Sequence, residues 1–262
     1  MKASELVRPI EEFAPVYEQE KWDNCGFSVG DPQMEVSKAL IALDCTESVV
    51  DEAIECGADI IITHHPLIFG GVKKITPQNE LGRIIYKAVK HNIAIYAAHT
   101  NMDKAAGGVS CIMADKLQLQ DMADKIGLAQ REILTPDGFG IAGFLEEELS
   151  VEEFVGKLKN AFGVDVVRCS APLKEKISRV AVCGGSGKSF IADAMGKGAQ
   201  VYVTGDITYH DFYAEKGFMV MDIGHYFSEY SIVDVFANIV YKNFPNFAVS
   251  ISKRNNNPIY YY

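Results

Sequence analysis

Apolar runs of strand length alternate along the chain with stretches that carry apolar residues at helical spacing. In the first half the apolar runs lie at 38–44, 58–65 and 93–100, with helical patterns between them at 48–57 and 81–92. The second half repeats this order, with apolar runs at 178–185, 199–206 and 218–225 and helical patterns at 189–198 and 209–216. Such alternation is typical of a sheet with parallel strands that is flanked by helices.

The two halves look like divergent copies of one βαβ unit. The segments GADIIITHH (57–65) and GAQVYVTGD (198–206) share glycine, alanine and threonine at matching positions. Between the copies, at about 120–176, the pattern changes to strand, helix and strand, and Ser150 is the predicted cap of that helix. We predict an α/β fold with two related α/β domains built from a duplicated βαβ unit, with mixed or parallel sheets flanked by helices.

The last part of the chain continues as a helical pattern at 230–244 and a strand-like run at 248–254. We expect this tail to return to the first domain and to make it discontinuous. The predicted first domain comprises 1–125 and about 221–262, and the second comprises about 126–220.

Residues that ligate metals stand at the ends of the predicted strands. They are His64 and His65 in GADIIITHHP, Asp103 in HTNMD, and His225 and Glu229 in GHYFSEY. Side chains alternate across a strand, so His64 and His65 should leave theirs on opposite sides, which suits neighbouring ions better than one ion. The four-residue spacing would put His225 and Glu229 on one face of a helix. The pattern predicts a site for two divalent metal ions between the domains, with zinc, iron(II) and manganese all compatible with imidazole and carboxylate.

A two-ion site of this kind favours hydrolysis, in which a bridging hydroxide attacks a polarised electrophile. His99 and His210 also lie near ends of predicted strands, and each is a candidate for proton transfer or for orienting a ligand. A structural, hydrogen-bonded histidine is an equally good interpretation of either one.

Composition excludes several other classes of function. The net charge of −10 and the pI near 5.1 disfavour nucleic-acid binding, which needs a concentrated basic surface. The short basic stretches EKISR and SKRNNNP are interpreted as solvated turns and a frayed tail. The N-terminal segment has no continuous apolar core, and six scattered cysteines form no C-x-x-C pair, so we expect a cytoplasmic protein without a membrane anchor.

The segment CGGSGKS (183–189) has glycine, lysine and serine in the order of a phosphate-binding loop. The motif G-x-x-x-x-G-K-[ST] would need glycine at Val182, inside the predicted strand, so the loop is incomplete. We interpret the segment as a tight turn that needs Gly184 and Gly185.

The succession WDNCGFSVGD, THHPLIFGG, YAAHTNMDKAAGG, VTGDITYHD and DIGHYFSE resembles the Nif-three-like family of dinuclear metal proteins, often labelled GTP cyclohydrolase I type 2 homologues. The resemblance runs from about Trp22 to Glu229. It implies that His64 and Asp103 hold one ion, that His65 and His225 hold the other, and that Glu229 bridges them. It also implies a ring-shaped homohexamer. The stretch at 120–176 is too short for the domain that some relatives carry there, so the chain is a short form.

Two functional hypotheses follow. The first is a metal-dependent hydrolase that acts on a small molecule, a nucleotide or heterocyclic metabolite, with GTP implied by the resemblance. In it, His99 or His210 would carry protons to the leaving nitrogen, and the loop around Asp206 would shape the pocket. The alternative is a non-catalytic metal-binding protein, a metallochaperone or a regulatory scaffold.

Overall fold

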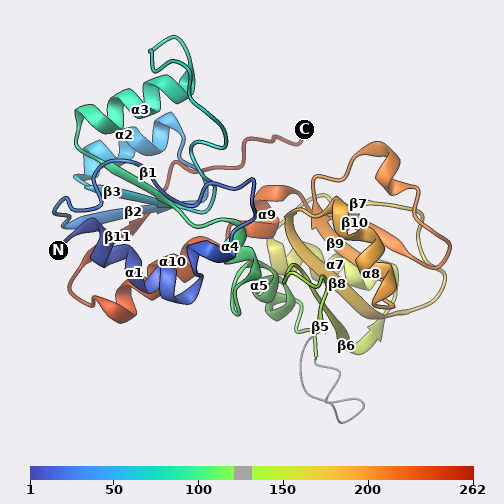
Figure 1. Cartoon of the computed structure of the whole chain (residues 1–262). Coiled ribbons are helices and arrows are strands. Elements are labelled where there is room, and N and C mark those ends of the chain that lie inside the picture. The colour runs from blue at the N-terminus through green and yellow to red at the C-terminus, as the bar shows by residue number, and fades with distance from the viewer. Residues whose placement is uncertain (121–131) are drawn as a thin grey trace. The chain divides into compact units, whose positions relative to one another are not determined.

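A computed structural model describes residues 1–120 and 132–262 of the chain, which divides into two compact units (Figure 1). Unit 1 comprises Met1–Ala105 and Ile232–Tyr262, and unit 2 comprises Ala106–Ser231. Unit 1 is therefore discontinuous in sequence, because all of unit 2 lies between its two segments.

The unit boundaries differ from those we predicted. The predicted boundary at 125–126 lies outside the described residues. Segments 106–120 and 221–231, predicted for the first domain, belong to unit 2. The reason is packing, since helices α5 (Val109–Lys116) and α9 (His225–Glu229) both lie against strand β8 (Ile177–Ser186).

Unit 1 is built on a five-stranded sheet in the order β1-β4-β3-β2-β11. Its strands are β1 (Gly26–Val29), β2 (Lys38–Ala42), β3 (Ile60–Thr63), β4 (Ala94–Ala97) and β11 (Ala248–Ile251). The last four are parallel, and β1 is antiparallel to β4. The carboxyl ends of β2, β3 and β4 therefore lie at one edge of the sheet, where open α/β sheets place their ligand sites.

Helices cover both faces of this sheet, as Figure 1 shows: α2 (Glu47–Cys56) and α3 (Glu80–Lys90) on one face, and α1 (Ala3–Phe13) and α10 (Ile232–Asn243) on the other. The short helices η1 (Val16–Glu18) and α4 (Thr100–Lys104) complete the unit. Helix α2 begins where the Thr46 side chain accepts a hydrogen bond from Val49 N, and it ends at Gly57 in the left-handed conformation. Asn79 caps α3 in the same way as Thr46 caps α2. Local capping and the apolar run in β3 together explain why this half of the sequence forms these elements.

Unit 2 is built on a second sheet, which among the described residues has six strands in the order β5-β6-β8-β9-β10-β7. Besides β8, its strands are β5 (Glu132–Ile133), β6 (Ile141–Leu149), β7 (Arg168–Cys169), β9 (Val201–Gly205) and β10 (Met219–Asp222). Strands β8, β9 and β10 are parallel, and the others pair antiparallel. In the part of unit 2 that the structure describes, the remaining helices are α7 (Val151–Phe162), α8 (Ile191–Gly196), η2 (Lys188–Phe190) and η3 (Tyr209–Phe212).

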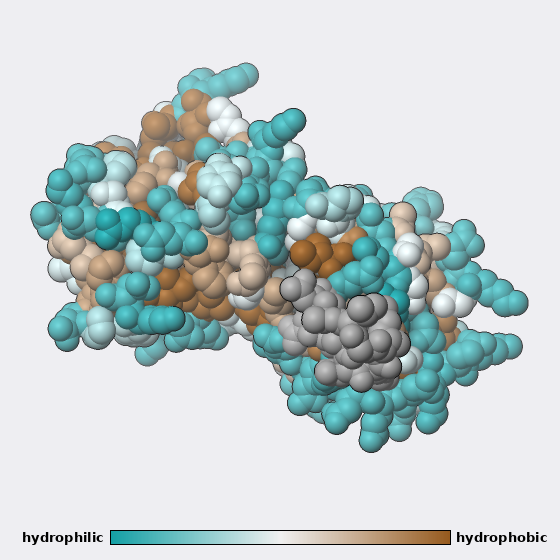
Figure 2. Space-filling view, turned by 60° about the horizontal axis from the view of Figure 1, so that its bottom comes forward, coloured by the Kyte–Doolittle hydropathy of each residue, from teal (hydrophilic) through white to brown (hydrophobic). Residues whose placement is uncertain are grey.

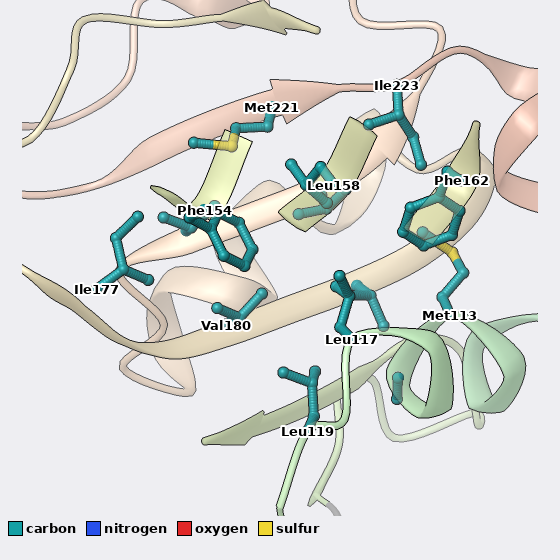
Figure 3. Packing of buried hydrophobic residues seen from close by; sticks show 14 of the residues in the cluster. Met113, Leu117, Leu119, Phe154, Leu158, Phe162, Ile177, Val180, Met221 and Ile223 are labelled. Carbon is teal, nitrogen blue, oxygen red and sulfur yellow. The ribbon is translucent and has the colours of Figure 1, made fainter. Parts of the chain in front are cut away.

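A large apolar core holds α7 and α5 against the sheet of unit 2. Phe154, Leu158 and Phe162 recur at every fourth position of α7 and so form one buried face (Figure 3). They belong to the same cluster as Val180 of β8 and Met113 of α5. Burying such a side chain completely stabilises the fold by roughly 1.5–3 kcal/mol, so this face fixes α7 on the sheet. Ser150 caps α7 through a capping box with Glu153, as predicted.

The predicted fold class is confirmed: both units are α/β, their sheets are mixed, and helices flank them. The order β2-α2-β3-α3-β4 in unit 1 corresponds to β8-α8-β9-η3-β10 in unit 2. The helix predicted at 209–216 is a single 3-10 turn, η3, which ends because Tyr213 leaves the helical conformation with φ −79° and ψ 69°.

Hydrophilic residues cover most of the face shown in Figure 2, and hydrophobic residues form smaller patches between them. This surface agrees with the 23% of charged residues and the net charge of −10. Within 1–120 and 132–262, no helix combines the length and the hydrophobicity that crossing a bilayer requires.

Candidate metal centre

Three histidines lie at the edge of the unit 1 sheet where its parallel strands end. His64 and His65 follow β3 directly, and His99 follows β4. One ligand atom from each of the three imidazoles lies within 4.8 Å of the others, close enough to serve a single ion. The expectation that His64 and His65 leave the strand on opposite sides is wrong, because β3 ends at Thr63 and the ring centroids are only 5.1 Å apart.

His64 is fully buried, and its Nδ1 lies 2.9 Å from the carbonyl oxygen of Ala98. A carbonyl only accepts, so Nδ1 carries the proton and Nε2 keeps its lone pair. His64 Nε2 lies 3.5 Å from Oδ1 of Asp103. Two atoms bound about 2.1 Å from one ion at a tetrahedral angle lie about 3.4 Å apart, so this pair is spaced as two ligands of one ion.

Oδ1 of Asp103 supports the same interpretation. This oxygen is buried and accepts no hydrogen bond from the residues that the structure describes. A buried carboxylate oxygen without a donor is costly, and a bound cation would offset that cost. The donors present in unit 1 therefore fit a divalent ion.

His65 is oriented by a carboxylate, since its Nδ1 lies 2.7 Å from Oδ1 of Asp44, the second residue after β2. The carboxylate accepts the Nδ1 proton, fixes the tautomer and leaves Nε2 to bind a ligand. The sequence prediction missed Asp44, although its place at the end of the run KALIALD is the same signal that identified His64 and His65.

The C-terminal tail reaches the same edge of the sheet and holds Asp44. Oδ1 of buried Asn255 accepts hydrogen bonds from the backbone N–H groups of Leu43 and Asp44, the second at 3.0 Å. The two residues before Asn255 are also held, because the backbone N–H groups of Lys253 and Arg254 donate hydrogen bonds to the carboxylate of Glu52 in α2. The interpretation of SKRNNNP as a frayed tail is wrong for residues 252–255, because these bonds fix them on unit 1.

His99 forms a similar pair with Asp23. Its Nδ1 lies 2.9 Å from Oδ1 of Asp23, whose other oxygen accepts hydrogen bonds from the backbone N–H and the hydroxyl of Thr100. Burial alone would raise the pKa of Asp23, but the hydrogen bonds from His99 and Thr100 and the charge of His99 hold that pKa well below its usual range. Asp23 is therefore an anion that orients His99.

Unit 2 presents the remaining two predicted ligands. His225 and Glu229 lie on one face of α9, as predicted, with His225 Nε2 at 2.9 Å from Oε2 of Glu229. A separation of 2.9 Å is an N–H···O hydrogen-bond distance, and both atoms are also of the types that bind divalent metals. His225 Nδ1 lies 2.8 Å from Oδ2 of Asp206, which adopts a positive φ of 56° just after β9.

Glycines at the end of β8 make room for Glu229. A Cβ atom at Gly185, which has a φ of +61°, would lie 2.1 Å from Oε1 of Glu229, and one at Gly184 would lie 2.2 Å from Val109. The segment CGGS continues β8 rather than forming the tight turn we predicted. Gly184 and Gly185 are needed there because α9 and α5 approach the strand too closely for any side chain.

The structure does not place His210 with any of the clustered histidines in the described residues. Its exposed ring lies in η3 among Tyr209 and Tyr213, with centroids 5.3 Å and 6.4 Å away. Its predicted role in proton transfer stays a prediction.

Comparison with known proteins agrees with these observations. The family model described as Duf34/NIF3 (NGG1p interacting factor 3) matches residues 1–258. A Clostridium perfringens protein named GTP cyclohydrolase 1 type 2 homolog is 38% identical over 235 residues, which cover 89% of this chain and 88% of that protein. A protein of the same name from Clostridium acetobutylicum is 33% identical, with 98% of both chains covered.

A solved structure has the same fold over the whole chain. The crystal structure of a Bacillus cereus protein related to NIF3 superposes with a TM-score of 0.88 at 27% identity, and the match covers 100% of this chain and 99% of that one. The resemblance inferred from the ordered motifs is thus confirmed, and the chain belongs to the Duf34/NIF3 family.

Proposed function

We propose that this protein binds two divalent metal ions through His64, His65, Asp103, His225 and Glu229 and hydrolyses a nucleotide or heterocyclic metabolite. The observation that carries the proposal is the state of the imidazoles. His64 and His65 each direct Nδ1 at an oxygen that only accepts, so the proton lies at Nδ1 and Nε2 is the atom that would bind a metal.

When bound, such ions polarise an electrophile and make water nucleophilic near neutral pH. The chain's own residues supply the rest of the proposed chemistry. His99 holds or releases a proton at Nε2, and Asp23, whose side chain is not exposed, stabilises its protonated form through the Nδ1 hydrogen bond. The name GTP cyclohydrolase 1 type 2 homolog, carried by the Clostridium relatives, supports GTP as the first substrate to test.

Metal analysis tests the site. We expect about two ions per chain in the wild type, loss of mainly one ion in His65→Ala, and disturbance of both in Glu229→Gln, because Glu229 is the proposed bridge. His91→Ala is a matched control, since exposed His91 only ends helix α3. No transition metal after gentle purification and reloading would refute the site, and equal losses in the two ligand variants would refute the bridge.

Activity is tested on the metal-loaded protein with a panel of nucleoside triphosphates, with products separated by chromatography. We expect products that require the metal and that disappear in Asp103→Ala, because this substitution removes an anionic ligand. Circular dichroism confirms that the variant is folded. Full metal content without any product would instead favour the alternative of a metal-binding protein without turnover.

A further inference from the structure

Two large aromatic side chains in unit 1 are exposed beside the histidine cluster. Trp22 is 61% exposed and Phe69 is 53% exposed. Single exposed apolar residues are common on proteins, but these two come from separate loops and contact the same residue, His99. The ring centroid of Trp22 lies 6.0 Å from that of His99, and the centroid of Phe69 lies 5.6 Å from it.

The two loops are fixed to each other and to the histidine. Asn24 Nδ2, two residues after Trp22, donates a hydrogen bond of 2.7 Å to the carbonyl oxygen of Ile68. Asp23, which adjoins Trp22, is buried and bonded to His99. Each aromatic residue is thus the immediate neighbour of an anchored residue. Because the two loops are already anchored, a ligand that binds there has less loop and side-chain motion to restrict, and binding costs less conformational entropy.

The angles between the rings leave aromatic surface available. Trp22 and Phe69 meet the His99 ring at interplanar angles of 74° and 81°, so these edge contacts cover only part of each ring. Aromatic rings accept planar heterocycles by stacking, largely regardless of the identity of the base.

We propose that Trp22 and Phe69 form a binding site for a planar heteroaromatic ring, such as a nucleobase, next to His99. A ring of this class has apolar faces and polar edge atoms, and the site offers two apolar rings and one imidazole. The choice of ligand rests on the proposed function. A ring bound by Trp22 and Phe69 would place the heterocycle of the proposed substrate beside His99, the proposed proton-transfer residue. Binding itself requires no turnover.

Trp22 is the single tryptophan of the chain, so its fluorescence reports this site directly. The metal-loaded full-length protein is titrated with GTP, ATP and UTP, and with inorganic tripolyphosphate as a ligand that has the phosphates but no ring. We expect saturable quenching by at least one nucleotide and none by tripolyphosphate. Equal responses to all four ligands, or no response to any, would overturn the proposal.

Variants test the two rings separately. Equilibrium dialysis with labelled nucleotide should show binding weakened roughly 10- to 100-fold in Trp22→Ala and in Phe69→Ala, because a stack on an aromatic ring is lost. Phe69→Tyr should restore binding. Tyr86→Ala is the matched control, since Tyr86 is 59% exposed on α3, and it should bind as the wild type does.

The outcomes separate this inference from the proposed function. Nucleotide binding that depends on Trp22 and Phe69 without any hydrolysis would support the ring site and contradict the hydrolase. Metal-dependent hydrolysis with an unchanged KM in both variants would overturn the ring site alone. If Trp22→Ala instead changes the mass measured by light scattering and leaves nucleotide binding intact, the two rings contact a second copy of the chain and the proposal fails.

Discussion

At the scale of single residues, each candidate metal-binding imidazole is paired with an acceptor at Nδ1, and His99 shares this feature. The cluster of His64, His65 and His99 makes His99 a possible ligand by geometry alone, whereas our proposal gives it a proton-transfer role. These two roles make different predictions for the same substitution.

His99→Gln should lower turnover roughly 10²- to 10⁴-fold, the usual contribution of general acid–base catalysis, while metal content stays at the wild-type level. Turnover and elemental analysis of the same preparation check this. Loss of one ion in His99→Gln would assign His99 to the ligands instead.

Gly185→Ala should lower metal content, because the new Cβ would lie 2.1 Å from Oε1 of Glu229 and force that side chain to move. The left-handed backbone adds a cost of about 1–2 kcal/mol in unfolding free energy. Gly163→Ala is the control for that cost, since Gly163 has a similar φ of +67° and an added Cβ there meets nothing within 4 Å. Equal metal content in the two variants would contradict the close approach to Glu229.

At the scale of elements, the sequence predicted the strands of both βαβ units, the helices α2, α3, α7, α8 and α10, and five candidate ligands, because these depend on local signals. It did not predict α1, β1 or α5. An apolar run identifies β3, and a four-residue spacing identifies the shared face of α9. The partners that orient the histidines lie far away in sequence: 21 residues from His65 to Asp44, 76 from His99 to Asp23 and 211 from Asp44 to Asn255. Such pairings depend on the order of strands in the sheet, which periodicity alone does not determine.

The C-terminal tail provides a test of this long-range support. Asn255→Ala should weaken retention of the ion at His65 by roughly 10- to 100-fold, because it releases the segment that carries Asp44 and leaves buried backbone donors without an acceptor. Asn256→Ala changes an exposed neighbour of the same type and should retain metal as the wild type does. Competition with a chelator measures both. Identical retention would show that the tail does not position Asp44.

At the scale of the whole molecule, bound metal should contribute to the stability of the fold. A ligand that binds only the folded state stabilises it by about 2.7 kcal/mol when present at 100 times its Kd. We therefore expect a chelator to lower the melting temperature of the wild type in calorimetry. The decrease in melting temperature should be much smaller in Glu229→Gln, and it should equal that of the wild type in the control His91→Ala. A shift of the same size in all three proteins would mean that the chelator acts elsewhere.

The discontinuity of unit 1 also has a consequence for synthesis on the ribosome. Strand β11, the partner of β2, and Asn255, which binds Leu43 and Asp44, are made only after all of unit 2. In a nascent chain that has reached residue 231, the edge of β2 is therefore unpaired. The hydrogen bonds by which Asn255 holds Asp44, the partner of His65, are also missing. Acquisition of metal at His65 is thus expected to follow completion of the chain, and shortened products should be both poor in metal and prone to pair through that open edge.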